Sequence, residues 1–127
     1  MLTVTTGLVD FSCNSDVKCL KKPVQYQCTV NSTIILQWRI RDENSTSLGT
    51  EGYIATNHLV TTPVAFPNSL PFFTDYTSKS PSLISNISFT VQSSINGYTI
   101  HCEDGDGNME NCTIDIAGDT QFTVACQ

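Results

Sequence analysis

Basic side chains are scarce in this chain of 127 residues, in which 6 lysines and arginines stand against 12 aspartates and glutamates, for a net charge of −6. A protein that binds nucleic acid regardless of sequence, or docks on anionic lipid, needs basic groups to neutralise phosphates. Long apolar runs are missing too, since runs such as Ile34-Ile35-Leu36 fall far short of the roughly 20 residues of a spanning helix. We therefore expect no nucleic-acid partner and no direct insertion into a membrane.

Motifs of catalysis and zinc binding are also missing. The sequence has no Cys-x-x-Cys, Gly-x-Ser-x-Gly, His-Glu-x-x-His or phosphate-binding loop, and its two histidines are His58 and His101. An enzyme needs a nucleophile or base held by an orienting group. His101 falls on the polar side of an alternating segment, where we expect a solvated side chain. We expect no catalytic residue, no bound metal and no cofactor.

Cysteines and glycosylation sequons indicate the compartment. An even number of cysteines is typical of full pairing in an oxidising space, and Asn-x-Ser/Thr sequons mark glycan acceptors in secreted chains. Met1–Thr6 lack the pattern of a signal peptide, so we interpret the chain as a piece of a longer extracellular protein. Chance sequons in a composition rich in Ser, Thr and Asn are the alternative. The six cysteines are Cys13, Cys19, Cys28, Cys102, Cys112 and Cys126, and the sequons begin at Asn31, Asn44, Asn86 and Asn111.

Apolar residues recur at every second position, which predicts strands with one buried and one wet face. With 39% hydrophobic residues and a length typical of one domain, residues 1–127 are expected to form a single all-β domain of two packed antiparallel sheets. The predicted strands are Val24–Val30, Ile34–Ile40, Leu83–Val91, Gly97–Glu103, a segment around Phe122 and Val124, and an edge strand within Leu2–Phe11.

Four prolines interrupt the segment Thr61–Pro81. Proline cannot donate to a strand ladder, so this segment can hold edge strands at most. Its apolar side chains either cover the end and edge of the sandwich or form a partner surface. They are Val64, Phe66, Leu70, Phe72, Phe73 and Tyr76.

Cys28, Trp38 and Cys102 all lie on the apolar faces of their predicted strands. An inter-sheet disulfide with the tryptophan against it satisfies the three positions together, and from this pattern the chain resembles the immunoglobulin superfamily. The resemblance implies an immunoglobulin-like sandwich of the variable or intermediate type, because the separation of 74 positions from Cys28 to Cys102 leaves room for extra strands. It also implies a core that includes Trp38. Tyr98 points inward as well, but it lies four residues before Cys102 rather than the usual two.

Four cysteines are additional to the family pattern, and such bridges are similar to those of invertebrate cell-surface receptors. We expect the pairs Cys13–Cys19 and Cys112–Cys126, the second across a hairpin at Gly118–Thr120. The competing pair is Cys19–Cys126, since the first and last strands of variable-type domains run side by side.

An acidic loop follows the last predicted core strand and contains Asp104, Asp106 and Asn108. It is expected to form a hairpin tip that binds a partner protein, with Ca²⁺ coordination as the alternative. We interpret the chain as a non-catalytic module of a cell-surface protein that recognises another protein, including a second copy of itself, in adhesion or self/non-self recognition. The alternatives are a ligand-binding module of a signalling receptor such as a receptor tyrosine kinase, and a secreted Ca²⁺- or glycan-binding protein.

Overall fold

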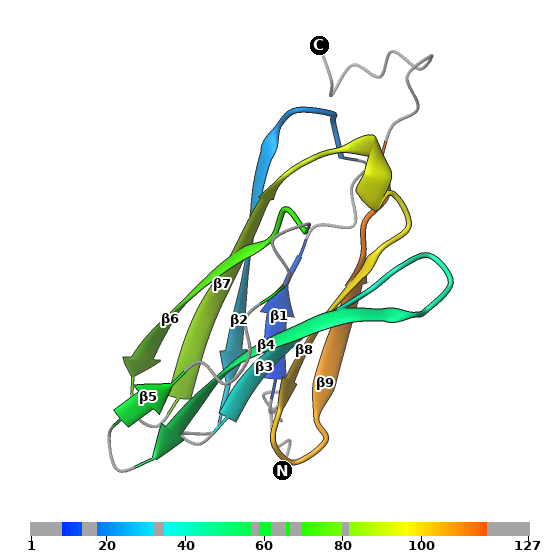
Figure 1. Ribbon diagram of the computed structural model, residues 1–127. Coiled ribbons are helices and arrows are strands. Elements are labelled where there is room, and N and C mark those ends of the chain that lie inside the picture. Colours follow the sequence, from blue (N-terminus) through cyan, green and yellow to red (C-terminus); the bar gives the residue numbers. More distant parts are fainter. Residues whose placement is uncertain are drawn as a thin grey trace, which may run out of the picture.

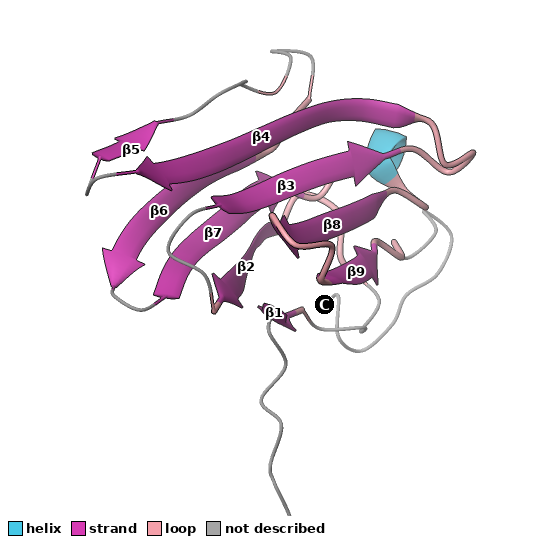
Figure 2. Ribbon diagram, turned by 90° about the horizontal axis from the view of Figure 1, so that it is seen from below, coloured by secondary structure: helices cyan, strands magenta, loops and turns pink. Residues whose placement is uncertain are grey.

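Two antiparallel sheets form the layers of a sandwich (Figures 1 and 2). The computed structural model describes residues 9–13, 18–31, 35–56, 59–61, 66, 70–79 and 82–116. Within these residues one sheet has four strands in the order β1-β2-β7-β6, and the other has five in the order β5-β4-β3-β8-β9. The expected fold class, an all-β antiparallel sandwich, is confirmed.

The strands and their bounds are as follows. The four-stranded sheet comprises β1 (Val9–Ser12), β2 (Pro23–Val30), β6 (Phe73–Lys79) and β7 (Ser82–Thr90). The five-stranded sheet comprises β3 (Ile35–Arg41), β4 (Ser47–Thr56), β5 (Leu59–Thr61), β8 (Thr99–Asp104) and β9 (Met109–Thr113). A short 3-10 helix, η1 (Ser93–Ile95), precedes β8.

The alternating segments predicted from the sequence coincide with β2, β3, β7 and β8. The proline-rich segment contributes to edge strands, β5 and β6, as proline chemistry predicted. The strand β4 gave no sequence signal because Gly49 and Gly52 interrupt its alternation. A Cβ atom at Gly52 would lie 3.1 Å from the side chain of Gln37, so the close approach of β4 to β3 favours glycine there. The predicted strand around Phe122 and Val124 lies outside the described residues, as does most of Leu2–Phe11.

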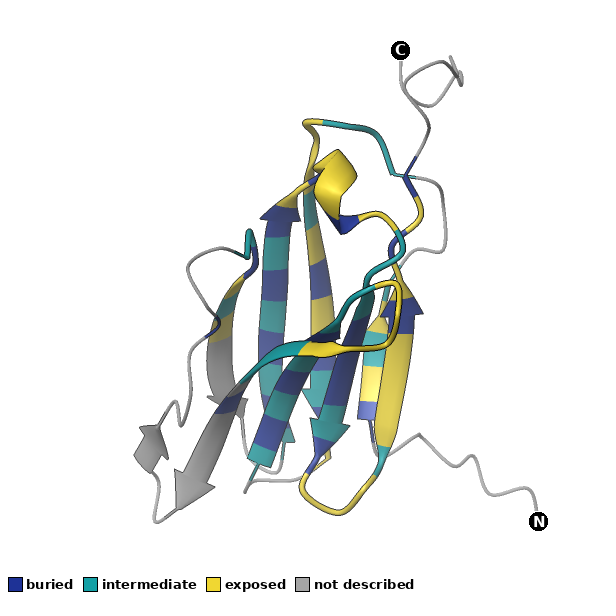
Figure 3. Ribbon diagram, turned by 45° about the vertical axis from the view of Figure 1, so that its right-hand side comes forward, coloured by how far each residue is buried: buried dark blue, intermediate teal, exposed yellow. Residues whose placement is uncertain are grey.

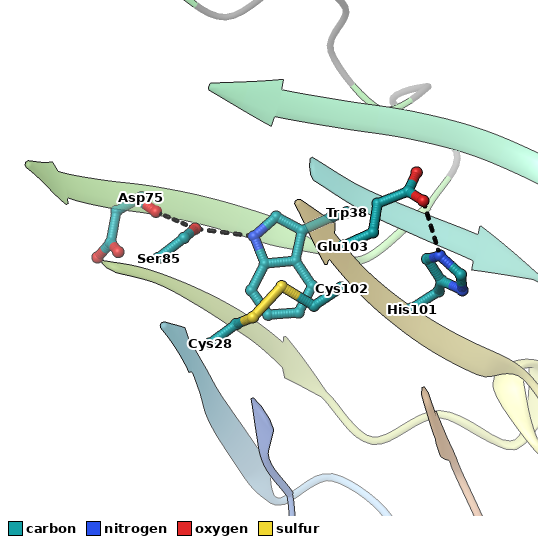
Figure 4. The surroundings of a disulfide bond; sticks show 7 residues. All are labelled: Cys28, Trp38, Asp75, Ser85, His101, Cys102 and Glu103. Atoms are coloured by element: carbon teal, nitrogen blue, oxygen red, sulfur yellow. Dashed lines mark hydrogen bonds and ion pairs between the residues drawn. A yellow bond between two sulfur atoms is a disulfide. The ribbon is translucent and has the colours of Figure 1, made fainter. Parts of the chain in front are cut away.

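The centre of the core is a disulfide between Cys28 on β2 and Cys102 on β8, which joins the two sheets with a Cα–Cα distance of 6.6 Å. Both cysteines and Trp38 are fully buried, and the indole lies beside the sulfur atoms (Figure 4). The predicted bridge and its tryptophan are therefore confirmed. Tyr98 immediately precedes β8 and is half-buried against the core, whereas Ile100 on β8 is fully buried.

A serine completes this core. The Trp38 Nε1–H donates to Ser85 Oγ at 2.8 Å, and the Ser85 hydroxyl donates to the backbone carbonyl of Asp75 (Figure 4). Sequence reasoning missed Ser85, although it occupies an inward position of β7 between the buried residues Leu83 and Ile87. The bond supplies the partner that a buried indole N–H needs, and it connects β3 to β7 across the sandwich.

A second disulfide joins Cys13 to Cys112, with a Cα–Cα distance of 6.4 Å. The predicted pairs Cys13–Cys19 and Cys112–Cys126 are therefore wrong. These pairs were predicted from proximity in sequence. In the structure β1 contacts β9, and further along the chain Lys18 pairs with Ile116 in a parallel β-bridge. Cys19 is also disulfide-bonded. The alternative pair Cys19–Cys126 stays a prediction, because Cys126 lies outside the described residues.

Candidate recognition surface

The acidic loop between β8 and β9 is built around the Asp104 carboxylate. Its Oδ1 accepts the backbone N–H groups of Asp106 at 2.8 Å and of Asn108 at 3.1 Å, and its Oδ2 accepts the Asn108 side-chain amide at 2.9 Å. The Asp104 N–H donates in turn to the Asn108 carbonyl at 3.0 Å, and Gly107 takes a positive φ of 92° that closes the turn. Asp104 is only 4% exposed, so its carboxylate stabilises the turn, and contact of this loop with a partner stays a prediction.

Hydrogen bonding makes Asp104 an acid-sensitive element of this loop. Burial by itself raises the pKa of the carboxyl group, but the bonds from the Asn108 side chain and from the backbone N–H groups of Asp106 and Asn108 outweigh burial, and the pKa lies below its ordinary value. A carboxyl whose pKa is lower in the folded than in the unfolded chain stabilises the fold above its unfolded pKa. That stability is lost as the pH falls through the folded pKa.

We predict that Asp104→Asn lowers the free energy of unfolding by about 1–3 kcal/mol at pH 7, because the neutral amide cannot accept all three N–H groups. The difference from wild type should shrink as the pH falls below the ordinary pKa of 3.8. Urea unfolding at several pH values measures both effects. The control is Asp106→Asn at the exposed tip, which should leave the free energy within about 0.5 kcal/mol. A deficit in Asp104→Asn that stays constant to pH 2 would contradict the assignment.

The same loop presents a mixed acidic and apolar tip. Asp106 and Glu110 are exposed, and Met109 is 48% exposed at the start of β9. Figure 3 colours the turn and most of β9 as exposed. Gly105 lies against Ile35, since a Cβ atom there would be 3.1 Å from the Ile35 Cδ1. Of the three predicted loop residues, Asp106 alone is exposed, and Asn108 is held half-buried by its bonds to Asp104.

The oxygens that a cation would need are already engaged in this loop, because both carboxylate oxygens of Asp104 accept N–H groups. Among the residues that the structure describes, no group of three or more His, Cys, Asp or Glu side chains is arranged to hold a metal ion.

The side chain of His101 is buried, contrary to the expectation of a solvated position. It is 3% exposed, although it lies on the outer face of β8. Its Nδ1 hydrogen-bonds Asn111 Oδ1 at 2.8 Å, and its Nε2 lies 3.4 Å from Glu103 Oε2 (Figure 4). Arg39 reaches the other oxygen of Glu103 at 3.6 Å. These polar neighbours on β3, β8 and β9 cover the imidazole, which strand alternation alone could not indicate.

Most described apolar residues of Thr61–Pro81 belong to the core. Phe66 and Phe72 are buried, with ring centroids 6.4 Å apart, and Phe72 packs on Phe89 at 5.1 Å. Leu70 is half-buried against the same cluster. Phe73 alone among those with described side chains is fully exposed, at 71%. Val64 and the side chain of Tyr76 lie outside the described residues.

The four sequons are spread over the molecule. Asn31 is exposed at the end of β2, and Asn44 is exposed in the β3–β4 turn, where Asp42 Oδ1 accepts its backbone N–H at 2.9 Å. Asn86 lies in the middle of β7, and Asn111 lies on the edge strand β9. Glycans at these positions would occupy different sides of the sandwich.

No protein-family model, no curated protein and no solved structure matches this chain. Among the described residues, no helix is long and apolar enough to span a membrane.

Proposed function

We propose that this chain is an immunoglobulin-superfamily domain of the variable or intermediate type, in the extracellular part of a cell-surface protein. Its function is non-catalytic recognition of another protein, in adhesion or self/non-self recognition. The observation that carries the proposal is the strand order. Variable-type immunoglobulin sandwiches add two strands to the sheet that bears the second cysteine, and β4 and β5 extend the sheet of β8 in the same way.

The disulfides and the loop support this proposal. Two described disulfides and four sequons suit an extracellular compartment. The β8–β9 tip offers Met109 as an apolar anchor, flanked by Asp106 and Glu110. A rigid turn with a central apolar side chain and a charged rim resembles the anatomy of protein interfaces. The acidic rim favours a basic partner surface, and exposed Lys21 and Lys22 give a second copy such a surface.

The test is aggregation of beads coated with the chain, with binding of the soluble chain measured in parallel. Met109→Ser should weaken self-association at least tenfold, as expected for loss of an interface anchor of about 1.4 kcal/mol or more. Asp106→Asn with Glu110→Gln should slow association and flatten its salt dependence.

The control variant is Ser94→Ala, which changes an exposed side chain on η1 and should bind like wild type. Unchanged binding by both tip variants would remove the β8–β9 loop from the interface. A loss of aggregation on chelation of Ca²⁺ would favour the metal-binding alternative.

A further inference from the structure

Phe73 is an exposed aromatic residue that lies beside a groove and a glycosylation sequon. It is 71% exposed on β6, an edge strand of the four-stranded sheet. It also borders an open groove of about 560 Å³, whose walls include Leu70, Pro71 and Ser88. A single exposed apolar side chain is ordinary on a protein surface, and its exposure alone indicates no partner.

The neighbour of Phe73 on the same face is the sequon Asn86-Ile87-Ser88. The register of β6 and β7 pairs Phe73 with Ser88 and Asp75 with Asn86, which makes Phe73 and Asn86 diagonal neighbours on one side of the sheet. Diagonal residues lie about 7–8 Å apart, within reach of an aromatic side chain. Ile87 points into the core and is fully buried, so the two polar residues of the sequon face outward.

Asp75 fixes the orientation of the Asn86 amide. Its Oδ1 accepts the Asn86 backbone N–H at 3.1 Å and the Asn86 Nδ2–H at 3.0 Å. A primary amide has two N–H groups, so one can be replaced by a sugar while the other continues to donate to Asp75. The side chain is thus held in one position on the outer face, two residues along the ladder from Phe73.

We propose that Asn86 carries an N-linked glycan whose first sugar lies on the ring of Phe73. In the transfer, Asn86 Nδ2 attacks the anomeric carbon of a lipid-diphosphate-linked oligosaccharide. A carbon–nitrogen bond forms, the carbon–oxygen bond to the diphosphate breaks, and the amide loses one proton. The C–H groups of a pyranose face then meet the electron-rich face of the phenyl ring, which favours partly positive hydrogens.

This arrangement assigns the outer face of the four-stranded sheet to carbohydrate. A glycan that starts at Asn86 and crosses Phe73 reaches the groove beside Leu70 and Pro71, so a partner protein is excluded from that surface. The inference requires passage through the secretory pathway. It does not require the recognition activity of the β8–β9 tip, so the two proposals can fail separately.

The experiment uses the chain secreted from a glycosylating host, with glycopeptide mapping and thermal unfolding. We expect a glycan on Asn86 and a melting temperature higher by about 3 °C than that of Ser88→Ala, which abolishes the sequon and retains the Asn86–Asp75 bonds. In chains that also carry Phe73→Ser, this difference in melting temperature between the glycosylated chain and Ser88→Ala should vanish. Trimming the glycan with an endoglycosidase that leaves the first sugar on Asn86 should preserve the difference.

The matched control is the sequon at Asn44. Asn44→Gln should change the melting temperature by the same amount in the wild-type chain and in the Phe73→Ser variant. An unmodified Asn86 alongside glycans at Asn31, Asn44 or Asn111 would overturn the proposal and leave the extracellular assignment intact. A stabilising increment that persists with Phe73→Ser would overturn the contact with the ring. Beads coated with the Ser88→Ala variant should aggregate like those coated with the wild-type chain, because the β8–β9 tip does not include Asn86.

Discussion

Replacing both Cys28 and Cys102 by alanine is expected to lower the free energy of unfolding by at least about 3 kcal/mol. The bridge closes a separation of 74 residues, for which the chain-entropy treatment gives about 4 kcal/mol. Cys13 and Cys112 lie on either side of this pair in the sequence and are themselves joined. The chain can therefore pass from Cys28 to Cys102 through the Cys13–Cys112 bridge, along a path of about 25 residues. Closing this shorter loop contributes about 3.5 kcal/mol to the free energy of unfolding. Because both sulfurs are fully buried, the alanines also leave a cavity beside Trp38 that adds to the loss.

The comparison with Cys13→Ala/Cys112→Ala separates the two causes. With the Cys28–Cys102 bridge in place, the Cys13–Cys112 bridge closes the same effective loop of about 25 residues, so entropy alone predicts an equal loss of about 3.5 kcal/mol. Cys13 is half-buried, however, so its removal leaves a smaller void. Urea unfolding under non-reducing conditions should show the larger loss for the Cys28/Cys102 variant. A smaller loss for that variant would contradict a packing contribution from the inter-sheet bridge.

Trp38→Ala is expected to destabilise the domain by about 3–5 kcal/mol, the range for removal of a large buried aromatic side chain. The indole is fully buried, meets Phe11 edge to face with ring centroids 5.3 Å apart, and donates to Ser85 Oγ. Both contacts reach from β3 to the four-stranded sheet, so the loss of the indole removes packing between the two sheets. Circular dichroism should be used to follow the unfolding, because Trp38 is the single tryptophan of the chain and the variant has no tryptophan fluorescence.

Two milder variants separate the packing of Trp38 from its hydrogen bond. Trp38→Phe retains an aromatic ring but leaves Ser85 Oγ without its donor. Ser85→Ala retains the indole but leaves its N–H buried and unpaired, for an expected loss of about 1–3 kcal/mol. If Ser85→Ala were as stable as wild type, the Trp38–Ser85 bond would contribute nothing net to the joining of the sheets.

The structure of the acidic β8–β9 loop was partly predictable from the sequence. The Asp-Gly-Asp-Gly-Asn tract located the hairpin tip, because these residues supply turn chemistry wherever they occur. The roles within the tip were not predictable. Asp104 and Asp106 look equivalent in sequence, yet Asp104 lies inside the turn as an acceptor for three N–H groups and Asp106 lies outside it.

Local chemistry in the sequence determined the fold class, the strands β2, β3, β7 and β8, and the bridge between Cys28 and Cys102. The period of two is a property of each strand alone, and it fixed which side chains face inward. The prolines likewise restricted their segment to sheet edges through the missing N–H.

Tertiary structure alone decided the features that join distant segments. Cys13 pairs with Cys112 because β1 and β9 meet at the margin of the two sheets, and sequence spacing carries no record of which edges come together. His101 is buried on an outward-facing position because Arg39 and Asn111 lie opposite it on the neighbouring strands β3 and β9 and Glu103 lies two residues along its own strand. Alternation predicts the direction of a side chain, whereas its burial depends on what the rest of the chain places over it.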